Sequence, residues 1–335
     1  MPAAGIRSAD ERAPAWAILN PKARDYVRAR QALVRACQAD GLGIPRILTT
    51  STAEPGGGQA KEALAAGAQV VIVGGGDGTV RQVAGVLAGS GVELGILPLG
   101  TANLFAHNLG LRTRLLRIAL RRALTPGATP VDIAWASWRP VIDTQLAPST
   151  RECAFLVMAG VGHDAATVVA TQETAKARFG WLAYLASGAS RLRARPLAMR
   201  VSTDMRPARR IRTWTLIVAN CGEIPAGIQV VAAASPFDGQ LDTLEVPLSS
   251  PRQWAAVAAT GLWPRLGNTV ALRYGQAQTV WAVPDHPTPL HLDGDPVGDV
   301  ADLRVRIQPG ALLVRRGHSQ TTPFNRFEIL NRGRR

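Results

Sequence analysis

From Trp16 to Leu109 the chain alternates short apolar runs with segments in which apolar residues recur every three or four positions. The apolar runs are typical of buried strands, and the periodic segments are typical of helices with one buried face. The predicted strands are Trp16–Leu19, Ile44–Thr49, Val70–Val73 and Glu93–Leu97, and the predicted helices are Tyr26–Ala39, Gln59–Ala66, Thr79–Leu87 and Asn103–Leu109. Strands that alternate with helices predict a parallel sheet with helices on both faces.

After Val131 the pattern changes to short β-branched segments that are separated by Gly, Pro and Asp. The predicted strands here are Phe155–Met158, Met199–Thr203, Trp214–Val218, Leu241–Val246, Thr279–Val283 and Leu303–Ile307, with one predicted helix at Thr174–Leu192. Such segments predict a mainly antiparallel β domain. We therefore expect an α/β domain at 12–132 and a β-rich domain at 133–310, with 311–330 packing back on the first domain.

The composition adds a strong positive charge to this picture. The chain has 335 residues, 47% hydrophobic and 19% charged, which is typical of globular domains. Its formal net charge of +14 favours an anionic partner, which is nucleic acid, an anionic membrane surface or a phosphate-bearing ligand. The three cysteines have no metal-binding spacing and suit a reducing compartment. No apolar run approaches the ~20 residues of a spanning helix, so we expect the chain not to cross a membrane.

A glycine-rich stretch, GGGDGT (Gly74–Thr79), follows one predicted strand and leads into a predicted helix. It does not fit a Rossmann fingerprint, whose last glycine would fall at Thr79 or Arg81, and it lacks the lysine of a P-loop. The backbone N–H groups of a glycine loop at a helix N-terminus nevertheless attract phosphate. Asp77 would repel that phosphate unless a cation lies between them, and Mg²⁺ bridges carboxylates to phosphates in this way. The alternative is a plain tight turn that Asp77 caps.

A second loop of similar character follows the next predicted strand. It has the sequence LPLGTANLFAHNLG (Leu97–Gly110), carries Gly100 and Thr101, and begins a helix near Asn103. Ligands of parallel sheets bind at the carboxyl ends of the strands. The two Gly-Thr loops are therefore placed to hold one nucleotide from both sides.

Several spaced motifs together resemble the diacylglycerol kinase catalytic family. They are GGGDGT, LPLGTAN, the turn Asn20-Pro21-Lys22 and LDGDP at Leu292–Pro296, with GVGHDA at 160–165, KARFGWLAY at 176–184 and ASPFDGQLD at 234–242 in the family's order. Within the family the chain looks most similar to the soluble bacterial lipid kinases, which are relatives of the sphingosine and ceramide kinases. The resemblance covers about residues 15 to 315. It implies an α/β domain of the phosphofructokinase and NAD-kinase type, an antiparallel β-sandwich domain, and a cleft between them.

The resemblance also implies ATP and Mg²⁺ as cofactors and assigns roles to residues. Nucleotide binding falls to Asn20, Thr50, Gly74, Gly75, Gly76, Asp77, Gly78, Thr79, Gly100, Thr101 and Asn103. Asp295 matches the glutamate that accepts the proton in relatives, and Asp293 is able to share or take that role. Ser235, Asp238 and Gln240 match a structural Mg²⁺ site. Taken without the resemblance, Asp-Gly-Asp is also a strong hairpin signal.

Some positions depart from the family pattern. Leu104 stands where an aspartate is frequent and His107 where an arginine is frequent, and NPKAR lacks the usual Ser-Gly after Asn-Pro. These departures leave the identity of the acceptor lipid open. Arginines beside apolar residues, such as Arg117 and Arg121, favour contact with an anionic membrane or form a solvated surface. No recognition motif accompanies the arginines, so nucleic acid is not expected as a partner.

We therefore predict an ATP-dependent lipid kinase that phosphorylates a hydroxyl of diacylglycerol, a sphingoid base or a related membrane lipid. It would be cytoplasmic and peripheral at the inner membrane face, and a homodimer is left open. One alternative is an NAD-kinase-like enzyme, which shares the GGDGT loop, although the pairing of LPLGTAN with LDGDP argues against it. The other is a non-catalytic binder of anionic membranes, against which the retained Asp77, Thr101 and Asp293 argue.

Overall fold

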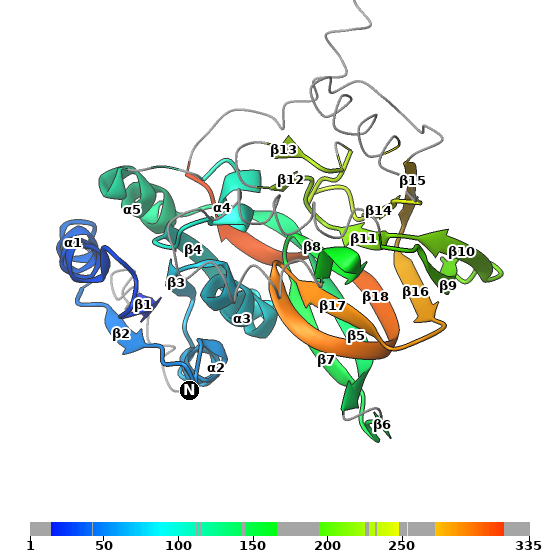
Figure 1. The fold of residues 1–335 in the computed structure, drawn as a ribbon. Coiled ribbons are helices and arrows are strands. Elements are labelled where there is room, and N and C mark those ends of the chain that lie inside the picture. The colour runs from blue at the N-terminus through cyan, green and yellow to red at the C-terminus, as the bar shows by residue number, and fades with distance from the viewer. Residues whose placement is uncertain are drawn as a thin grey trace, which may run out of the picture.

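A parallel sheet forms the first half of the protein (Figure 1). The computed structural model describes residues 15–317 except 42, 112, 114, 143–144, 166–193, 225–227, 232, 248–252 and 254–271. The strands of this half are β1 (Trp16–Leu19), β2 (Arg46–Thr49), β3 (Val70–Gly75) and β4 (Glu93–Pro98), and they run parallel in the order β2-β1-β3-β4. Each strand lies within a few residues of its predicted position, because a strand buried on both faces is a continuous apolar run.

Helices cover both faces of this sheet. They are α1 (Tyr26–Ala39), α2 (Gly57–Ala65), α3 (Asp77–Leu87), α4 (Leu104–Asn108) and α5 (Leu116–Leu124). The side chains of β3 alternate between the faces: Val70 and Ile72 pack with α1 and α5, whereas Val71 and Val73 pack with α2 and α3. The helix α3 begins directly after β3, at the carboxyl edge of the sheet.

The second half is mainly antiparallel. Its strands are β5 (Ala128–Ile142), β6 (Gln145–Leu146), β7 (Arg151–Phe155), β8 (Met158–Gly162), β9 (Leu197–Thr203), β10 (Arg209–Thr213), β11 (Thr215–Ala219), β12 (Glu223–Ile224), β13 (Ile228–Gln229), β14 (Leu241–Glu245), β15 (Arg273–Ala277), β16 (Thr279–Pro284), β17 (Thr288–Leu292) and β18 (Asp295–Arg315). The long strand β18 pairs antiparallel with β5, β16 and β17, and its last residues pair parallel with β4. One strand thus connects the sheets of the two halves.

The predicted strand Phe155–Met158 is wrong. The apolar run is divided between β7 and β8, and Leu156 and Val157 form a bend between them. The cause is a contact with a distant segment, because the N–H groups of this bend donate to the carboxylate of Asp293. The predicted helix Thr174–Leu192 and the KARFGWLAY motif lie outside the described residues.

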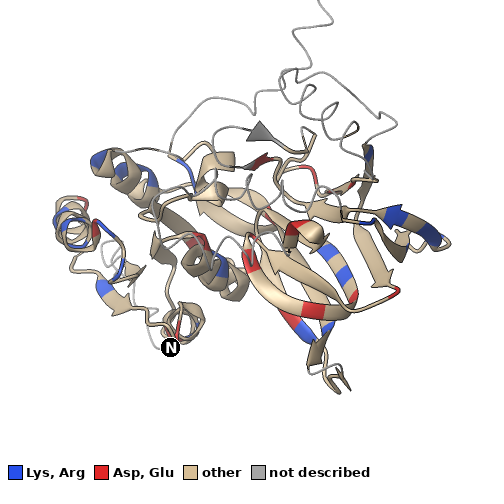
Figure 2. Ribbon diagram, in the orientation of Figure 1, with Lys and Arg blue, Asp and Glu red and all other residues tan. Residues whose placement is uncertain are grey.

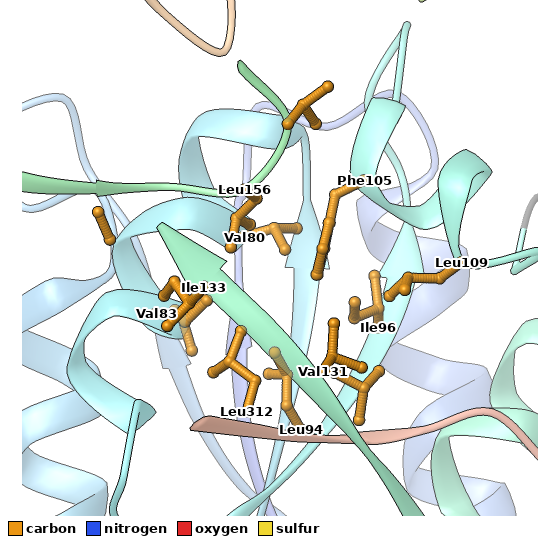
Figure 3. Packing of buried hydrophobic residues seen from close by; sticks show 14 of the residues in the cluster. Val80, Val83, Leu94, Ile96, Phe105, Leu109, Val131, Ile133, Leu156 and Leu312 are labelled. Carbon is orange, nitrogen blue, oxygen red and sulfur yellow. The ribbon is translucent and has the colours of Figure 1, made fainter. Parts of the chain in front are cut away.

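A single buried cluster packs the two halves against each other (Figure 3). Its side chains come from α3, β4 and α4 in the first half and from β5, β18 and the bend at Leu156 in the second. Labelled members are Val80, Val83, Leu94, Ile96, Phe105, Leu109, Val131, Ile133, Leu156 and Leu312. Because apolar burial stabilises by about 25 cal/mol per Å², this cluster fixes the position of α3 relative to the second half.

The predicted fold class is confirmed, with a parallel α/β half followed by an antiparallel β-sandwich half. The domain limits at 132 and 310 stay a prediction. Leu313 and Val314 of β18 lie beside Glu93 and Leu94 of β4, whereas residues 318–330 of the predicted returning segment lie outside the described part of the chain. Among the described residues, no helix is both long enough and apolar enough to span a bilayer.

Candidate active site

The glycine loop joins β3 to α3. Gly74 and Gly75 are the last residues of the strand, Gly76 has an extended backbone, and the helix begins at Asp77. Its N-cap residue is Gly76, which has no side chain to cap the helix. The first N–H groups of a helix have no partner within the helix and carry a partial positive charge. The arrangement therefore leaves donors available to an anion such as phosphate.

The second loop lies against the first. The N–H groups of Leu99 and Gly100 each donate to the carbonyl oxygen of Gly75 at 3.1 Å. The Asn103 side chain accepts from the N–H of Gly100 at 2.9 Å and donates to its carbonyl oxygen at 2.7 Å. Asn103 itself has a left-handed backbone with a φ of 49°, which asparagine tolerates better than most residues. The structure thus brings together the two loops that the sequence predicts to act jointly.

Gly100→Ala is expected to destabilise the fold and to weaken nucleotide binding, because the added Cβ would lie 2.4 Å from the Cα of Gly76. Forcing atoms into a packed site costs about 1–3 kcal/mol. Gly76→Ala is the matched control, since its Cβ would lie 3.6 Å from the Cα of Gly100, an ordinary contact. Urea unfolding of both variants measures the difference. Equal losses of stability would show that the loops do not meet in this way.

Asp77 connects the first loop to α4. Its Oδ1 accepts a hydrogen bond from the N–H of Phe105 at 3.3 Å. Burial raises the pKa of this carboxyl, backbone N–H groups at Phe105, Leu104 and Asn103 oppose that shift, and the negative charge of Asp293 adds to it. The ionised form of Asp77 is therefore disfavoured by burial and by the nearby negative charge of Asp293, and a bound cation would stabilise it.

The Asp-Gly-Asp sequence forms the tight turn between β17 and β18, as the hairpin signal predicts. Asp293 is buried with a left-handed φ of 52°. Its Oδ2 accepts from the N–H of Leu156 at 2.9 Å, and its Oδ1 accepts from those of Val157 and Met158 at 2.8 and 3.1 Å. Burial raises the pKa of this carboxyl, and Arg81 and the three N–H groups lower it. Both oxygens of Asp293 are thus already engaged by the backbone.

Asp295 is placed differently. Its side chain is 49% exposed, and its Oδ2 would lie 3.4 Å from a Cβ at Gly78, in the first turn of α3. Arg81, one turn further along α3, donates from Nη2 to this Oδ2 at 2.8 Å and from Nη1 to the carbonyl oxygen of Leu292 at 2.6 Å. The guanidinium therefore holds the turn against the helix and leaves the other carboxylate oxygen of Asp295 without a hydrogen bond to any described residue.

The remaining residues that the sequence predicts to bind nucleotide lie on neighbouring strand ends. Asn20 follows β1, and its N–H donates to the carbonyl oxygen of Gly74 at 2.8 Å. The side chain of Asn20 accepts from the N–H of Lys22 at 2.9 Å and shapes the turn into α1. Thr50 follows β2 and is buried, whereas Thr101 is exposed beyond Gly100. Asn20 therefore contacts the glycine loop directly, and Thr50 is one strand further out.

The residues that match a structural Mg²⁺ site lie before β14. Asp238 accepts from the N–H of Gln240 at 3.0 Å, and burial raises its pKa. The neighbouring Asp132, on β5, accepts from the N–H groups of Gly239 and Gly310 at 2.8 and 2.7 Å. Burial, together with the charge of Asp238, raises the pKa of Asp242 to about 6. Carboxylates gather here, although among the described residues no group of three or more His, Cys, Asp or Glu is arranged to hold a metal.

His107, at a position where the family often has arginine, contacts the second half of the protein. Its Nε2 lies 2.9 Å from Oε2 of Glu223. The adjacent Asn108 donates to the carbonyl oxygen of Glu223 at 3.0 Å and accepts from its N–H at 3.1 Å. The two Asn108 bonds fasten α4 to β12, and the imidazole of His107 lies beside the same contact.

The sequence did not point to Arg81 or Asp132. Arg81 lies two positions after the glycine motif, and the available signal was a charged residue on a predicted helix. Asp132 begins the second half within the apolar run VDIAWA, where a lone carboxylate indicates a buried acceptor. Both residues act on partners more than 100 positions away, which no local pattern reveals.

Two family models match the chain. One is described as the diacylglycerol kinase catalytic domain and matches residues 14–136, and the other is described as the YegS C-terminal NAD kinase beta sandwich-like domain and matches residues 156–316. A protein of Chromohalobacter salexigens named "Probable lipid kinase YegS-like" is 31% identical over 308 residues, or 89% of this chain and 92% of the relative. A protein of the same name from Pseudomonas aeruginosa is 32% identical over 258 residues, or 76% of this chain and 78% of the relative.

Solved structures share the fold. A diacylglycerol kinase from Bacillus anthracis superposes with a TM-score of 0.64 at 18% identity, covering 93% of this chain and 99% of that chain. A yeast NADH kinase, solved with NADH, gives a TM-score of 0.50 at 10% identity, covering 96% of this chain and 88% of that chain. At these identities the likeness concerns the fold alone.

The fold and the sequence matches define a kinase with an α/β catalytic domain and a β-sandwich domain. The chain belongs to the diacylglycerol kinase catalytic family and, within it, to the YegS-like lipid kinases.

Proposed function

We propose that the chain transfers the γ-phosphate of ATP to a hydroxyl group of diacylglycerol, a sphingoid base or a related membrane lipid. The observation that supports this most is the convergence of two groups. The uncapped N-terminus of α3 and the half-exposed carboxylate of Asp295 lie side by side, with Oδ2 3.4 Å from the Cβ position of Gly78. Phosphoryl transfer requires phosphate donors and a proton acceptor in this proximity.

We assign each group of residues a separate role in the reaction. The loops Gly74–Thr79 and Gly100–Asn103 bind the phosphates of ATP, and Asn20 and Thr50 support them. The lipid hydroxyl oxygen attacks the γ-phosphorus, the bond from that phosphorus to the β–γ bridging oxygen breaks, and the hydroxyl proton passes to Asp295. We assign the proton acceptor to Asp295 because it is half-exposed, whereas both oxygens of Asp293 are engaged by the backbone.

The charges of the site fit a nucleotide-bound Mg²⁺. Arg81 pairs with Asp295 and lowers the pKa of Asp293, which burial raises. The pKa of Asp77 is raised by burial and, in addition, by the negative charge of Asp293. An ATP anion placed here would meet an excess of negative charge. When bound, Mg²⁺ would neutralise phosphate charge between the nucleotide and Asp77.

A second Mg²⁺, bound at Ser235, Asp238 and Gln240, is expected to stabilise the fold in the absence of nucleotide. Because few carboxylates are arranged for it, carbonyl oxygens would complete its coordination, which Mg²⁺ accepts. A ligand at 100 times its Kd adds about 2.7 kcal/mol. Thermal unfolding with Mg²⁺ and with EDTA measures this gain, which Asp238→Asn should remove and Asp25→Asn, an exposed change on the first half, should keep. A gain that survives Asp238→Asn places the ion elsewhere.

We propose peripheral contact with an anionic membrane at the cytoplasmic face through α1 and α5. A groove between these helices has Leu116, Leu120 and Leu124 on its floor. Four exposed arginines line it: Arg28, Arg35, Arg117 and Arg121. Figure 2 shows the positive charge on both helices. Arg209 and Arg210 on β10, in contrast, pair with Glu245 and Asp285, and Arg191 and Arg193 lie outside the described residues.

Charge reversal in this groove is expected to weaken membrane binding. Each arginine near an anionic surface contributes about 1 kcal/mol, so the double variant Arg117→Glu, Arg121→Glu should lose at least about tenfold in affinity for phosphatidylglycerol vesicles. Arg30→Glu, which is exposed on α1 outside the groove, is the control. Co-sedimentation with vesicles measures binding. Equal losses per reversed charge in the groove and at Arg30 would assign the effect to net charge alone.

The test of the function is a phosphorylation assay with labelled ATP that offers diacylglycerol, sphingosine, ceramide and NAD as separate acceptors. We expect label in one of the lipids. Label in NADP alone would support the NAD-kinase-like alternative. Vesicle binding without any label transfer would support the non-catalytic alternative.

A further inference from the structure

A buried acid–imidazole pair lies directly beneath the Asp293–Asp295 turn. Nε2 of His291, near the end of β17, lies 3.0 Å from Oδ2 of Asp164, which follows β8. Their side chains are only 5% and 3% exposed. Titratable groups are rarely buried to this extent unless they are paired and bonded. The mechanism above uses neither residue.

The imidazole also contacts the turn itself. Its Nδ1 accepts a hydrogen bond from the N–H of Gly294 at 3.3 Å. Gly294 is the residue between the two aspartates and has a left-handed φ of 83°. A chain of contacts therefore runs from Asp164 through His291 to the backbone N–H of Gly294, the residue directly before Asp295.

These contacts determine which nitrogen of the His291 ring carries the proton. A neutral imidazole has one donor and one acceptor nitrogen. Because an N–H group faces Nδ1, Nδ1 has to carry the lone pair, and the proton has to be on Nε2, where it is donated to Asp164. A proton on Nδ1 would set two donors against each other, which repels the turn.

The packing shows that the pair is held tightly. A Cβ at Gly160 would lie 2.1 Å from Oδ2 of Asp164 and 2.3 Å from Nε2 of His291. The other oxygen of Asp164 accepts from the N–H of Ala165 at 2.7 Å and from the hydroxyl of Thr215. These contacts hold the carboxylate of Asp164 in place beside the imidazole of His291.

We propose that Asp164 and His291 are positioning residues for the phosphoryl transfer. They hold the peptide at Gly294 so that the carboxylate of Asp295 points at the N-terminus of α3. The proposal rests on the proposed function. Arg81, on α3, donates to the side chain of Asp295. The Asp164–His291 pair holds the backbone next to Asp295, through the N–H of Gly294. A displacement of about 1 Å at a reacting group can cost about 10²-fold in rate.

Asp164→Asn is the most informative variant. The amide would donate to Nε2, which favours the tautomer with the proton on Nδ1 and repels the N–H of Gly294. We expect kcat to fall about 10²-fold with the KM for ATP unchanged, because the glycine loops are not touched. Thr215→Val is the matched control, since it removes one buried hydrogen bond of Asp164 and leaves Oδ2 facing the ring. An Asp164→Asn variant with the kcat of Thr215→Val would overturn the proposal.

Two substitutions of His291 distinguish the contribution of the bond at Nδ1 from that of the bond at Nε2. Asparagine places an acceptor near Nδ1 and keeps the bond to Gly294, whereas glutamine reaches only toward Asp164. We expect His291→Asn to retain more kcat per folded protein than His291→Gln. The reverse order would contradict a role at the turn.

A spectroscopic measurement decides the geometry without any substrate. Long-range ¹H–¹⁵N spectra of the wild-type imidazoles, with His291 assigned by its loss in His291→Asn, should show a neutral ring protonated on Nε2 at pH 7. A ring protonated on Nδ1, or on both nitrogens, would overturn the proposal. This result is independent of the proposed function, because it is obtained even if no lipid accepts phosphate.

Discussion

Asp295→Asn is expected to lower kcat by about 10²–10⁴-fold, which is the usual contribution of a general base. The asparagine oxygen still accepts from Arg81, so the turn and the fold should persist. The KM for ATP should change little, because the donors at the N-terminus of α3 are unaffected. Steady-state kinetics with the identified lipid, together with a thermal unfolding curve for each variant, measure these effects.

A nearby carboxylate provides the control for this variant. Asp299 is exposed on the same strand, four positions further along β18. Asp299→Asn removes the same charge from the same hairpin and should leave kcat within about twofold, as expected for a group outside the reacting geometry. If both variants lose the same activity, the loss comes from charge and Asp295 is not the proton acceptor.

Asp293→Ala is expected to give the largest loss of stability. Its carboxylate accepts from three buried N–H groups in and beside the bend at Leu156. Each buried donor that loses its partner costs about 1–3 kcal/mol, so we expect a total of at least about 3 kcal/mol. Urea unfolding measures the loss, and the activity should fall because the bend holds the turn that carries the proposed proton acceptor, Asp295.

Asp293→Asn should lie between the wild type and the alanine variant. The amide oxygen is able to keep the two bonds to Val157 and Met158, whereas its NH₂ group would face the N–H of Leu156. The expected loss is that of one donor, about 1–3 kcal/mol. If Asp293→Asn keeps full stability and loses all activity, Asp293 acts in the chemistry and the assignment of the base to Asp295 is wrong.

Most of the first half of the fold can be predicted from the sequence. Apolar runs such as Val70–Val73 predict strands because both faces of a parallel sheet are covered. The glycine loop and its neighbour are recognisable because each joins a strand end to a helix start, and this placement brings them to one edge of the sheet. The structure joins them through Gly75, Gly76 and Gly100.

The second half and the details of the site depend on contacts that no local pattern contains. The apolar run at Phe155–Met158 has the composition of a strand, yet Asp293, 137 positions from Leu156, bends it. His291 and Asp164 are 127 positions apart and form a pair only in the folded chain. Local periodicity predicts which face of a helix or strand is buried. It does not predict which distant polar group contacts that face.

The choice between Asp293 and Asp295 shows the same limit. In the sequence Asp-Gly-Asp the two acids are equivalent, and either fits the chemistry. In the fold the carboxylate of Asp293 is buried with both oxygens bonded to the backbone, and that of Asp295 lies half-exposed beside α3. Burial and hydrogen-bond partners, which arise from the packing of β7, β8 and α3, distinguish them.

The most direct test of the central claim is to incubate the wild-type protein and its identified acceptor lipid, which is diacylglycerol, a sphingoid base or a related membrane lipid, with ATP labelled at either the γ- or the α-phosphate. The account predicts a labelled lipid phosphate from γ-labelled ATP only, and its loss in Asp295→Asn. Label in the lipid from α-labelled ATP, or undiminished transfer by Asp295→Asn, would contradict it.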